Sequence, residues 1–106
     1  MAGRRAKRFR ATRTIPVGFI ASNARFTGHL VDISKTGLLM RCSHSLALGT
    51  VGRIGIALAQ ETVRIVAVVR RHVPSVGIAF EFVQMSARDR ELLHRLLLRL
   101  EHPIGS

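Results

Sequence analysis

The fold is decided by the stretch Leu30-Val31-Asp32-Ile33-Ser34-Lys35-Thr36-Gly37-Leu38-Leu39-Met40. Apolar residues flank a short polar turn, which predicts the end of one strand and the start of the next. Asp32 and Ser34 lie two positions apart, so an extended chain would place both side chains on one face. Gly37 closes the turn, where we expect a positive φ or a close backbone approach. The stretch therefore predicts a carboxylate, a hydroxyl and an open backbone at one end of a sheet.

Alternating apolar and polar residues extend this pattern over most of the chain between residues 14 and 83. The clearest alternation places Ile78, Phe80 and Phe82 on one face, and in the run 50–58 we expect Val51 to join the apolar face. A turn is predicted at 22–25. The strands are predicted at 14–21, 26–33, 38–41, 50–58, 61–71 and 76–83. Six short strands joined by short turns predict an antiparallel barrel or sandwich.

A single helix is predicted after the last strand, where the apolar period lengthens. Ser86 is a candidate N-cap, and Asp89 three residues later favours a helix N-terminus. Pro103 would end the helix. The apolar stripe at helical spacing consists of Leu92, Leu93, Leu96, Leu97 and Leu100. We expect this helix to pack across the open end of the barrel.

Length and charge divide the chain into a basic arm and one folded domain. The chain has 106 residues, of which 47% are hydrophobic, and its net charge is +11. Such a length allows one domain with one core. Residues 1–13 are arginine-rich and lack apolar periodicity, so we predict a flexible arm that orders on binding an anion. The folded domain is predicted over residues 14–106.

Several function classes find no support in the sequence. One cysteine, Cys42, allows no intramolecular disulfide, and the only metal-ligand spacing is the weak pair Cys42-x-His44. The chain lacks a Gly-rich phosphate loop and a convincing pair of catalytic carboxylates. No run approaches the roughly 18 apolar residues of a membrane span, and the basic N-terminus lacks the apolar core of a secretion signal. We therefore expect a cytoplasmic protein that is no enzyme and holds no metal or cofactor.

The spacing Asp32-x-Ser34-x-x-Gly37, between two apolar strands and downstream of an arginine-rich segment, resembles the PilZ domain family. Domains of this family bind the bacterial second messenger cyclic di-GMP. The family fold is a six-stranded antiparallel β-barrel capped by one C-terminal α-helix. That order matches the elements predicted above over most of the chain. The resemblance thus implies an all-β, PilZ-like barrel with a C-terminal helix and a flexible basic N-terminal arm.

The resemblance also implies which arginines bind the ligand. The family's first motif, Arg-x-x-x-Arg, is matched by Arg4 and Arg8, with Arg5 beside the first arginine. Arginine side chains suit phosphates and the O6/N7 edge of guanine. Arg10 lies nearer to the first predicted strand and is a second candidate for the downstream position. If Arg10 takes that position, the motif requires an arginine four residues earlier, where Ala6 stands. Arg5 would then take the place of the missing arginine.

The family's second motif, which Asp32-x-Ser34-x-x-Gly37 matches, would supply the remaining ligand contacts. By the resemblance, Asp32 would accept hydrogen bonds from the N–H donors of a guanine. Ser34 would form local hydrogen bonds, and Gly37 would let the backbone approach. The implied protein is a cyclic di-GMP receptor whose arm changes conformation over the Asp32–Gly37 turn and signals to an unknown protein partner. Motility, exopolysaccharide synthesis or a similar bacterial process would be the output.

Two alternatives remain open from the residues alone. Net charge and the arginine arm permit a small basic β-barrel that binds nucleic acid. All five aromatic residues are phenylalanine and most are expected in the core, which leaves little for base stacking. Asp32 distinguishes the cyclic di-GMP receptor from the nucleic-acid-binding barrel, because a carboxylate repels a nucleic-acid backbone but accepts hydrogen bonds from guanine donors. The other alternative is a PilZ-like adaptor that no longer binds nucleotide.

Overall fold

The computed structural model describes residues 6–102, which form seven β-strands followed by one α-helix. Arg4 and Arg5 lie outside the described residues. The elements are β1 (Phe9–Arg10), β2 (Pro16–Ala21), β3 (Ala24–Ile33), β4 (Gly37–Arg41), β5 (Val51–Ala57), β6 (Thr62–Val73), β7 (Gly77–Gln84) and α1 (Ala87–Glu101).

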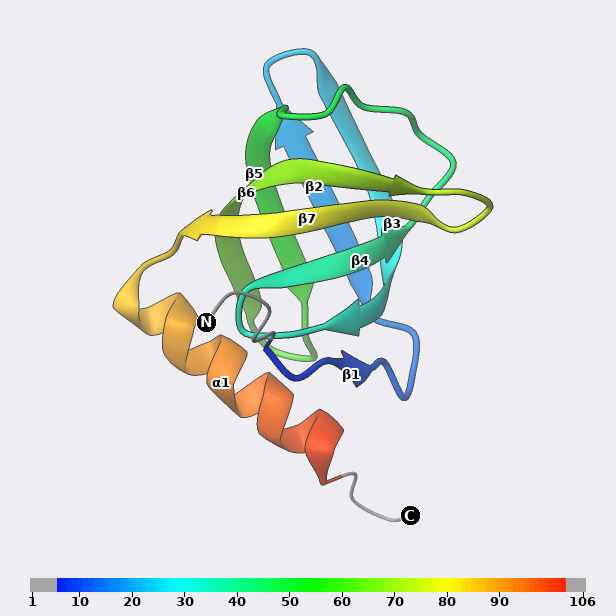
Figure 1. The fold of residues 1–106 in the computed structure, drawn as a ribbon. Helices are drawn as coiled ribbons and strands as arrows, with labels where there is room; N and C mark the ends of the chain where they lie inside the picture. The colour runs from blue at the N-terminus through cyan, green and yellow to red at the C-terminus, as the bar shows by residue number, and fades with distance from the viewer. Residues whose placement is uncertain (1–5, 103–106) are drawn as a thin grey trace, which may run out of the picture.

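The strands form one antiparallel sheet in the order β1-β3-β2-β5-β6-β7-β4. An additional pairing between β3 and β4 closes β2 to β7 into a six-stranded barrel. Figure 1 shows the barrel with β1 and α1 passing along its lower end. The predicted six-stranded antiparallel barrel with a C-terminal helix is therefore confirmed. The strand β1 is an addition that the sequence pattern did not predict.

The turn predicted at 22–25 is shorter in the structure. The ladder between β2 and β3 continues to the pair Ala21–Ala24, which leaves only Ser22 and Asn23 in the loop. A two-residue loop is the commonest connection between antiparallel strands. Consequently Arg25 belongs to β3, with Ile20 of β2 as its cross-strand partner.

The barrel is filled by the inward-facing residues of all six strands. Phe19 lies at the centre, with ring centroids 5.5 Å from Phe26 and 5.2 Å from Phe80. Gly52 faces this ring, and a Cβ there would come within 2.4 Å of it. Because Gly52 occupies the inward position, Val51 points outward and is 56% exposed. The prediction that Val51 contributes to the apolar face is therefore wrong.

Helix α1 begins at the predicted cap and is fixed to the barrel by both polar and apolar contacts. The Ser86 side chain accepts a hydrogen bond from the backbone N–H of Asp89 at 3.0 Å. Asp89 is buried and accepts hydrogen bonds from the Ser86 hydroxyl and from the backbone N–H of Arg64 in β6. The leucines that join the barrel core are Leu92, Leu93, Leu96 and Leu100.

Candidate functional site

The described part of the predicted arm, residues 6–13, lies along the end of β3 that carries the Asp32 motif (Figure 1). Phe9 pairs with Ile33 and Arg10 with Asp32, while the backbone N–H of Ala11 donates to the carbonyl of Val31 at 3.0 Å. The half-buried ring of Phe9 packs against the barrel core. We call residues 6–13 the arm segment. The pairing brings its arginines beside the motif, whereas its mobility stays a prediction.

An ion pair between Arg8 and Asp32 joins the two predicted motifs. The Nε and Nη2 atoms of Arg8 lie 2.8 and 2.7 Å from the same carboxylate oxygen, Oδ1 of Asp32. Among the described residues, none donates a hydrogen bond to the other oxygen. The Arg8 side chain is 46% exposed and that of Asp32 is 22% exposed. The pair is therefore accessible, and one carboxylate oxygen can still accept a donor.

Arg10 is the cross-strand partner of Asp32, and it lies two positions from Arg8. Directly opposed residues of an antiparallel pair project to the same face, and Arg8 reaches that face because it contacts the Asp32 carboxylate. Both arginines therefore belong to the face that carries Asp32. The exposed Arg10 forms no ion pair with another described residue. Arg8 and Arg10 thus flank one carboxylate, and either can reach a ligand placed there.

Ser34 organises the turn instead of facing solvent. Its side chain is fully buried, and its hydroxyl accepts a hydrogen bond from the backbone N–H of Thr36 at 3.1 Å. The hydroxyl also lies 3.4 Å from the carbonyl of Gly37, to which the backbone N–H of Ser34 donates at 2.8 Å. The hydrogen bonds observed at Ser34 are the local ones that were predicted. They hold the backbone just beyond Asp32 in one conformation.

Gly37 provides a close approach between β4 and β7. A Cβ at this position would lie 2.4 Å from the carbonyl oxygen of Phe80 in β7. The turn is further bound to β7 because the backbone N–H of Phe82 donates to the carbonyl of Thr36 at 2.8 Å. In the described chain only Gly49 among the glycines has a positive φ. The need for glycine at 37 therefore comes from backbone packing, and its contact with a ligand stays a prediction.

A third arginine lies beside the turn, on β6. Arg70 forms an exposed ion pair with Glu81 of β7, the residue that pairs with Gly37. From the sequence, Arg70 and Arg71 end the strand predicted at 61–71 and are candidates to face the ligand, although exposed charges at strand ends are common. The nearness of Arg70 to the turn depends on the β4–β7 and β6–β7 registers, which the sequence pattern does not reveal. The Arg70 side chain would therefore lie close to a ligand bound at the Asp32–Gly37 turn.

The arm segment is also tied to the end of helix α1. The ammonium group of Lys7 lies 3.3 Å from a carboxylate oxygen of Glu101 and 5.2 Å from the centre of the Phe9 ring. Lys7 is 71% exposed, so solvent screens this contact strongly. The contact between Lys7 and Glu101 therefore contributes little to holding the arm segment.

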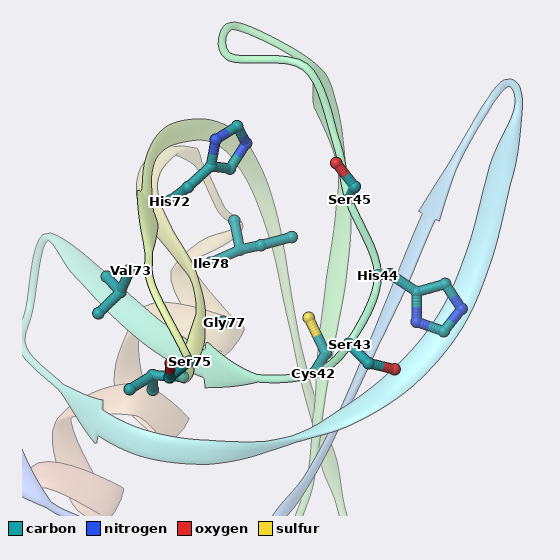
Figure 2. Close-up of a pocket in the computed structure, with 10 residues that line it drawn as sticks. Cys42, Ser43, His44, Ser45, His72, Val73, Ser75, Gly77 and Ile78 are labelled. Atoms are coloured by element: carbon teal, nitrogen blue, oxygen red, sulfur yellow. The ribbon is translucent and has the colours of Figure 1, made fainter.

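The pair Cys42-x-His44 is not arranged as a metal site. A cavity of about 400 Å³ lies beside it, and Figure 2 shows the Cys42 sulfur and the His44 ring pointing in different directions. The His44 ring stacks on Phe26 at 4.1 Å, and the His72 ring hydrogen-bonds to the carbonyl of Leu46. Across residues 6–102, no three potential metal-binding side chains come together. Within the same range, no helix is long and apolar enough to cross a bilayer.

Solved structures show the same fold. The PilZ domain of CeSA from a cellulose-synthesizing bacterium is 26% identical with a TM-score of 0.71, covering 92% of this chain and 100% of that domain. YcgR from Escherichia coli in complex with c-di-GMP is 21% identical with a TM-score of 0.76, covering 92% of this chain and 46% of that one. The Bacillus subtilis inhibitor of motility MotI/DgrA is 20% identical with a TM-score of 0.74, covering 92% and 51%. The chain thus spans about half the length of MotI and of YcgR.

Family membership follows from the sequence match together with this fold. No match is found among curated proteins. The family model described as PilZ domain matches residues 3–99, which is most of the chain. The matched range contains both motifs, the barrel and nearly all of helix α1. The chain therefore belongs to the PilZ domain family.

Proposed function

We propose that this chain is a cyclic di-GMP receptor of PilZ type, and that the ligand binds between the arm segment and the Asp32–Gly37 turn. The observation that carries the proposal is the ion pair between Arg8 and Asp32, residues 24 positions apart. It brings a guanidinium and a carboxylate together at an accessible edge of the barrel. YcgR, which shares this fold, is solved with c-di-GMP bound.

The chemistry of the ligand matches this pair of groups. Cyclic di-GMP carries two phosphodiester charges and two guanines. The N1–H and N2–H donors of a guanine suit the two oxygens of the Asp32 carboxylate, including the one that Arg8 contacts, while its O6 and N7 atoms suit a guanidinium. Arg8 and Arg10 would contact the phosphates or a guanine edge, and we assign Arg4 and Arg5 to the phosphates on the motif alone.

Ligand binding would change how the arm segment is held. In the structure Arg8 binds Asp32 directly, so a guanine that binds Asp32 takes the place of this contact. The arginines of the arm would then bind the ligand instead of the barrel, and the arm would be held through the ligand. This change in the shape and charge of one face would be read by a protein partner. Motility or exopolysaccharide synthesis is the output we expect.

An adaptor that binds no nucleotide is the second candidate. It is favoured by the same ion pair, because Arg8 and Asp32 already satisfy part of each other's hydrogen-bonding capacity. The contacts that a ligand makes must therefore contribute more free energy than is lost when the ion pair between Arg8 and Asp32 breaks. Arg8 is exposed and Asp32 is partly exposed, which keeps that cost small, since ion pairs near the surface contribute only about 0.2–1 kcal/mol. The balance favours the receptor.

Calorimetric titration with cyclic di-GMP at physiological salt tests the proposal. Wild type should bind saturably, and Asp32→Ala and Arg8→Ala should each weaken binding by about 10- to 150-fold, as expected for one charge-assisted contact. Arg90→Gln is the matched control, because it removes an exposed positive charge from α1. GTP and single-stranded DNA serve as comparison ligands.

Three outcomes would decide between the candidates. Saturable binding that both site variants weaken, with Arg90→Gln unchanged, supports the receptor. Absence of cyclic di-GMP binding, together with salt-sensitive DNA binding that ignores Asp32, would favour a nucleic-acid-binding barrel. Binding to neither ligand would leave the adaptor.

A further inference from the structure

A second surface, separate from the candidate site, crosses the outer face of the sheet formed by β2, β5 and β6. It is a groove of about 850 Å³ whose lining includes none of the site residues Arg8, Arg10, Asp32, Ser34 and Gly37. Arg25 lies at its edge, near the start of β3, whereas Asp32 lies near the end of the same strand. At about 3.3 Å per residue the two positions are roughly 20 Å apart.

The floor of the groove lacks side chains because two glycines face each other across neighbouring strands. Gly18 of β2 pairs with Gly55 of β5, and both line the groove. Gly18 lies between the buried residues Val17 and Phe19, so its position faces outward. A Cβ built at Gly18 would meet no atom within 4 Å. A Cβ at Gly55 would lie 3.3 Å from the Cγ2 atom of Thr62, so the open space of the hollow lies above Gly18.

Three arginines surround this hollow. Ile20 of β2 pairs with Arg25 of β3 on one side and with Arg53 of β5 on the other, and Arg64 of β6 pairs with Gly55. All three arginines are exposed, and none forms an ion pair with another described residue. The lining contains no acidic residue. The groove thus presents three positive charges, and one of them, Arg64, lies close enough to an acidic group, Asp89 of α1, to interact with it.

Apolar side chains alternate with the arginines across the strands, in the order Arg25, Ile20, Arg53 and Val66. Ile20 is 48% exposed, and half-buried Val66 pairs with Arg53 on the next strand. Met85, also half-buried, lines the groove where β7 leads into helix α1. Exposed apolar surface bordered by charge is typical of a protein-binding surface. Aliphatic side chains of a partner could pack on Ile20 and Val66 while its acidic groups pair with the arginines between and beside them.

We propose that this groove is the docking surface for an extended acidic segment of a partner protein, in which carboxylate and aliphatic side chains alternate. Charge complementarity selects an acidic partner. Nucleic acid is disfavoured because the aromatic rings in the lining, Phe19 and Phe26, are buried and offer no face for base stacking. The proposal does not depend on cyclic di-GMP binding, since the two surfaces share no residue.

Fluorescence anisotropy with a fluorescein-labelled synthetic peptide that alternates Glu and Leu tests the proposal on the full chain. Gly18→Val is the sharpest variant, because it fills the hollow without removing a charge. Valine also suits an exposed strand position, so the fold should be retained. We expect at least about tenfold weaker peptide binding for Gly18→Val and for Arg53→Gln, and a change below about twofold for Arg90→Gln.

The remaining measurements make every outcome decisive. Urea unfolding confirms that the variants are folded, and cyclic di-GMP affinity should not change in Gly18→Val. The proposal is overturned if wild type binds no peptide at concentrations up to about 1 mM. It is also overturned unless Gly18→Val and Arg53→Gln both weaken peptide binding more than Arg90→Gln does. Tighter binding of an oligothymidine that Gly18→Val abolishes would reassign the groove to nucleic acid.

Discussion

The arm segment and helix α1 both pack against the barrel, but they are held by contacts of different kinds. The helix is fixed by four leucines in the core and by the buried carboxylate of Asp89. The arm segment is held by two ladder pairs, one half-buried phenylalanine and two accessible ion pairs. Burial of apolar side chains contributes far more free energy than exposed ion pairs do. Helix α1 therefore belongs to the scaffold, and we predict that the arm segment is the part that moves.

The largest expected effect comes from truncating the buried face of the helix. Leu96 is 3% exposed, and Leu96→Ala should lower the free energy of unfolding by about 2–5 kcal/mol because it leaves a cavity. Leu98 on the same helix is 45% exposed, and Leu98→Ala should cost no more than about 0.5 kcal/mol. Urea unfolding measures both. Equal losses would contradict the assignment of the helix to the core.

A smaller loss of stability is expected at the turn beside the site. Gly37→Ala places a Cβ against the carbonyl of Phe80, so β4 and β7 must separate locally. We expect a loss of about 1–3 kcal/mol in the free energy of unfolding, as for other overpacked positions. Asp32→Ala is the matched variant, and it should leave stability nearly unchanged while weakening ligand binding. An unchanged free energy of unfolding in Gly37→Ala would show that a Cβ at this position fits without separating β4 and β7.

The helix cap should make stability depend on pH. The hydrogen bond from the Ser86 hydroxyl holds the pKa of Asp89 below its ordinary value, with the backbone N–H of Arg64 acting in the same direction. A carboxyl whose pKa is lowered by folding stabilises the protein above its unfolded pKa. That contribution is lost as the pH falls through the lower, folded pKa. The urea concentration at the unfolding midpoint of wild type should therefore decrease as the pH drops below about 4.

Asp89→Asn separates this effect from the titration of other carboxylates. The variant should be less stable near neutral pH, and it should lose less of its remaining stability on acidification than wild type does. Ser86→Ala should cost about 1 kcal/mol through the same cap. If wild type and Asp89→Asn lose stability in parallel between pH 5 and pH 2, the cap does not contribute as described.

The smallest effects on stability should come from the ion pairs of the arm segment. Lys7→Ala removes the contact with Glu101, and because both groups are exposed we expect a loss of no more than about 0.5 kcal/mol. Arg8→Ala should cost less than about 1 kcal/mol. Losses as large as that of Leu96→Ala, measured by urea unfolding, would mean that the arm segment is part of the scaffold.

The barrel and helix could be predicted because each element carries its own local pattern. Alternation marks the strands, and the leucine stripe behind Ser86 marks the helix. The strand β1 has only two residues and one apolar side chain, Phe9, so no periodicity identifies it. Its existence depends on the exposed edge that β3 offers at Ile33 and Asp32.

The site was predictable in its residue types but not in its contacts. The motif spacing predicts Asp32, Ser34 and Gly37 as candidates, whereas burial of Ser34 and the approach of Gly37 to Phe80 result from tertiary packing. The sequence pattern did not predict the groove. Gly18 and Gly55 look like unrelated interruptions in the sequence, and only the β2–β5 register places them side by side.

Hydrogen–deuterium exchange with and without cyclic di-GMP tests most directly whether the arm segment responds to the ligand while the helix stays fixed. The amide of Ala11, which donates to Val31, lies in the arm segment, and that of Leu96 lies in the helix. Our account predicts that saturating ligand slows exchange in residues 6–11 and leaves α1 unchanged. Ligand binding without slower exchange in the arm segment, or with an equal change in α1, would contradict it.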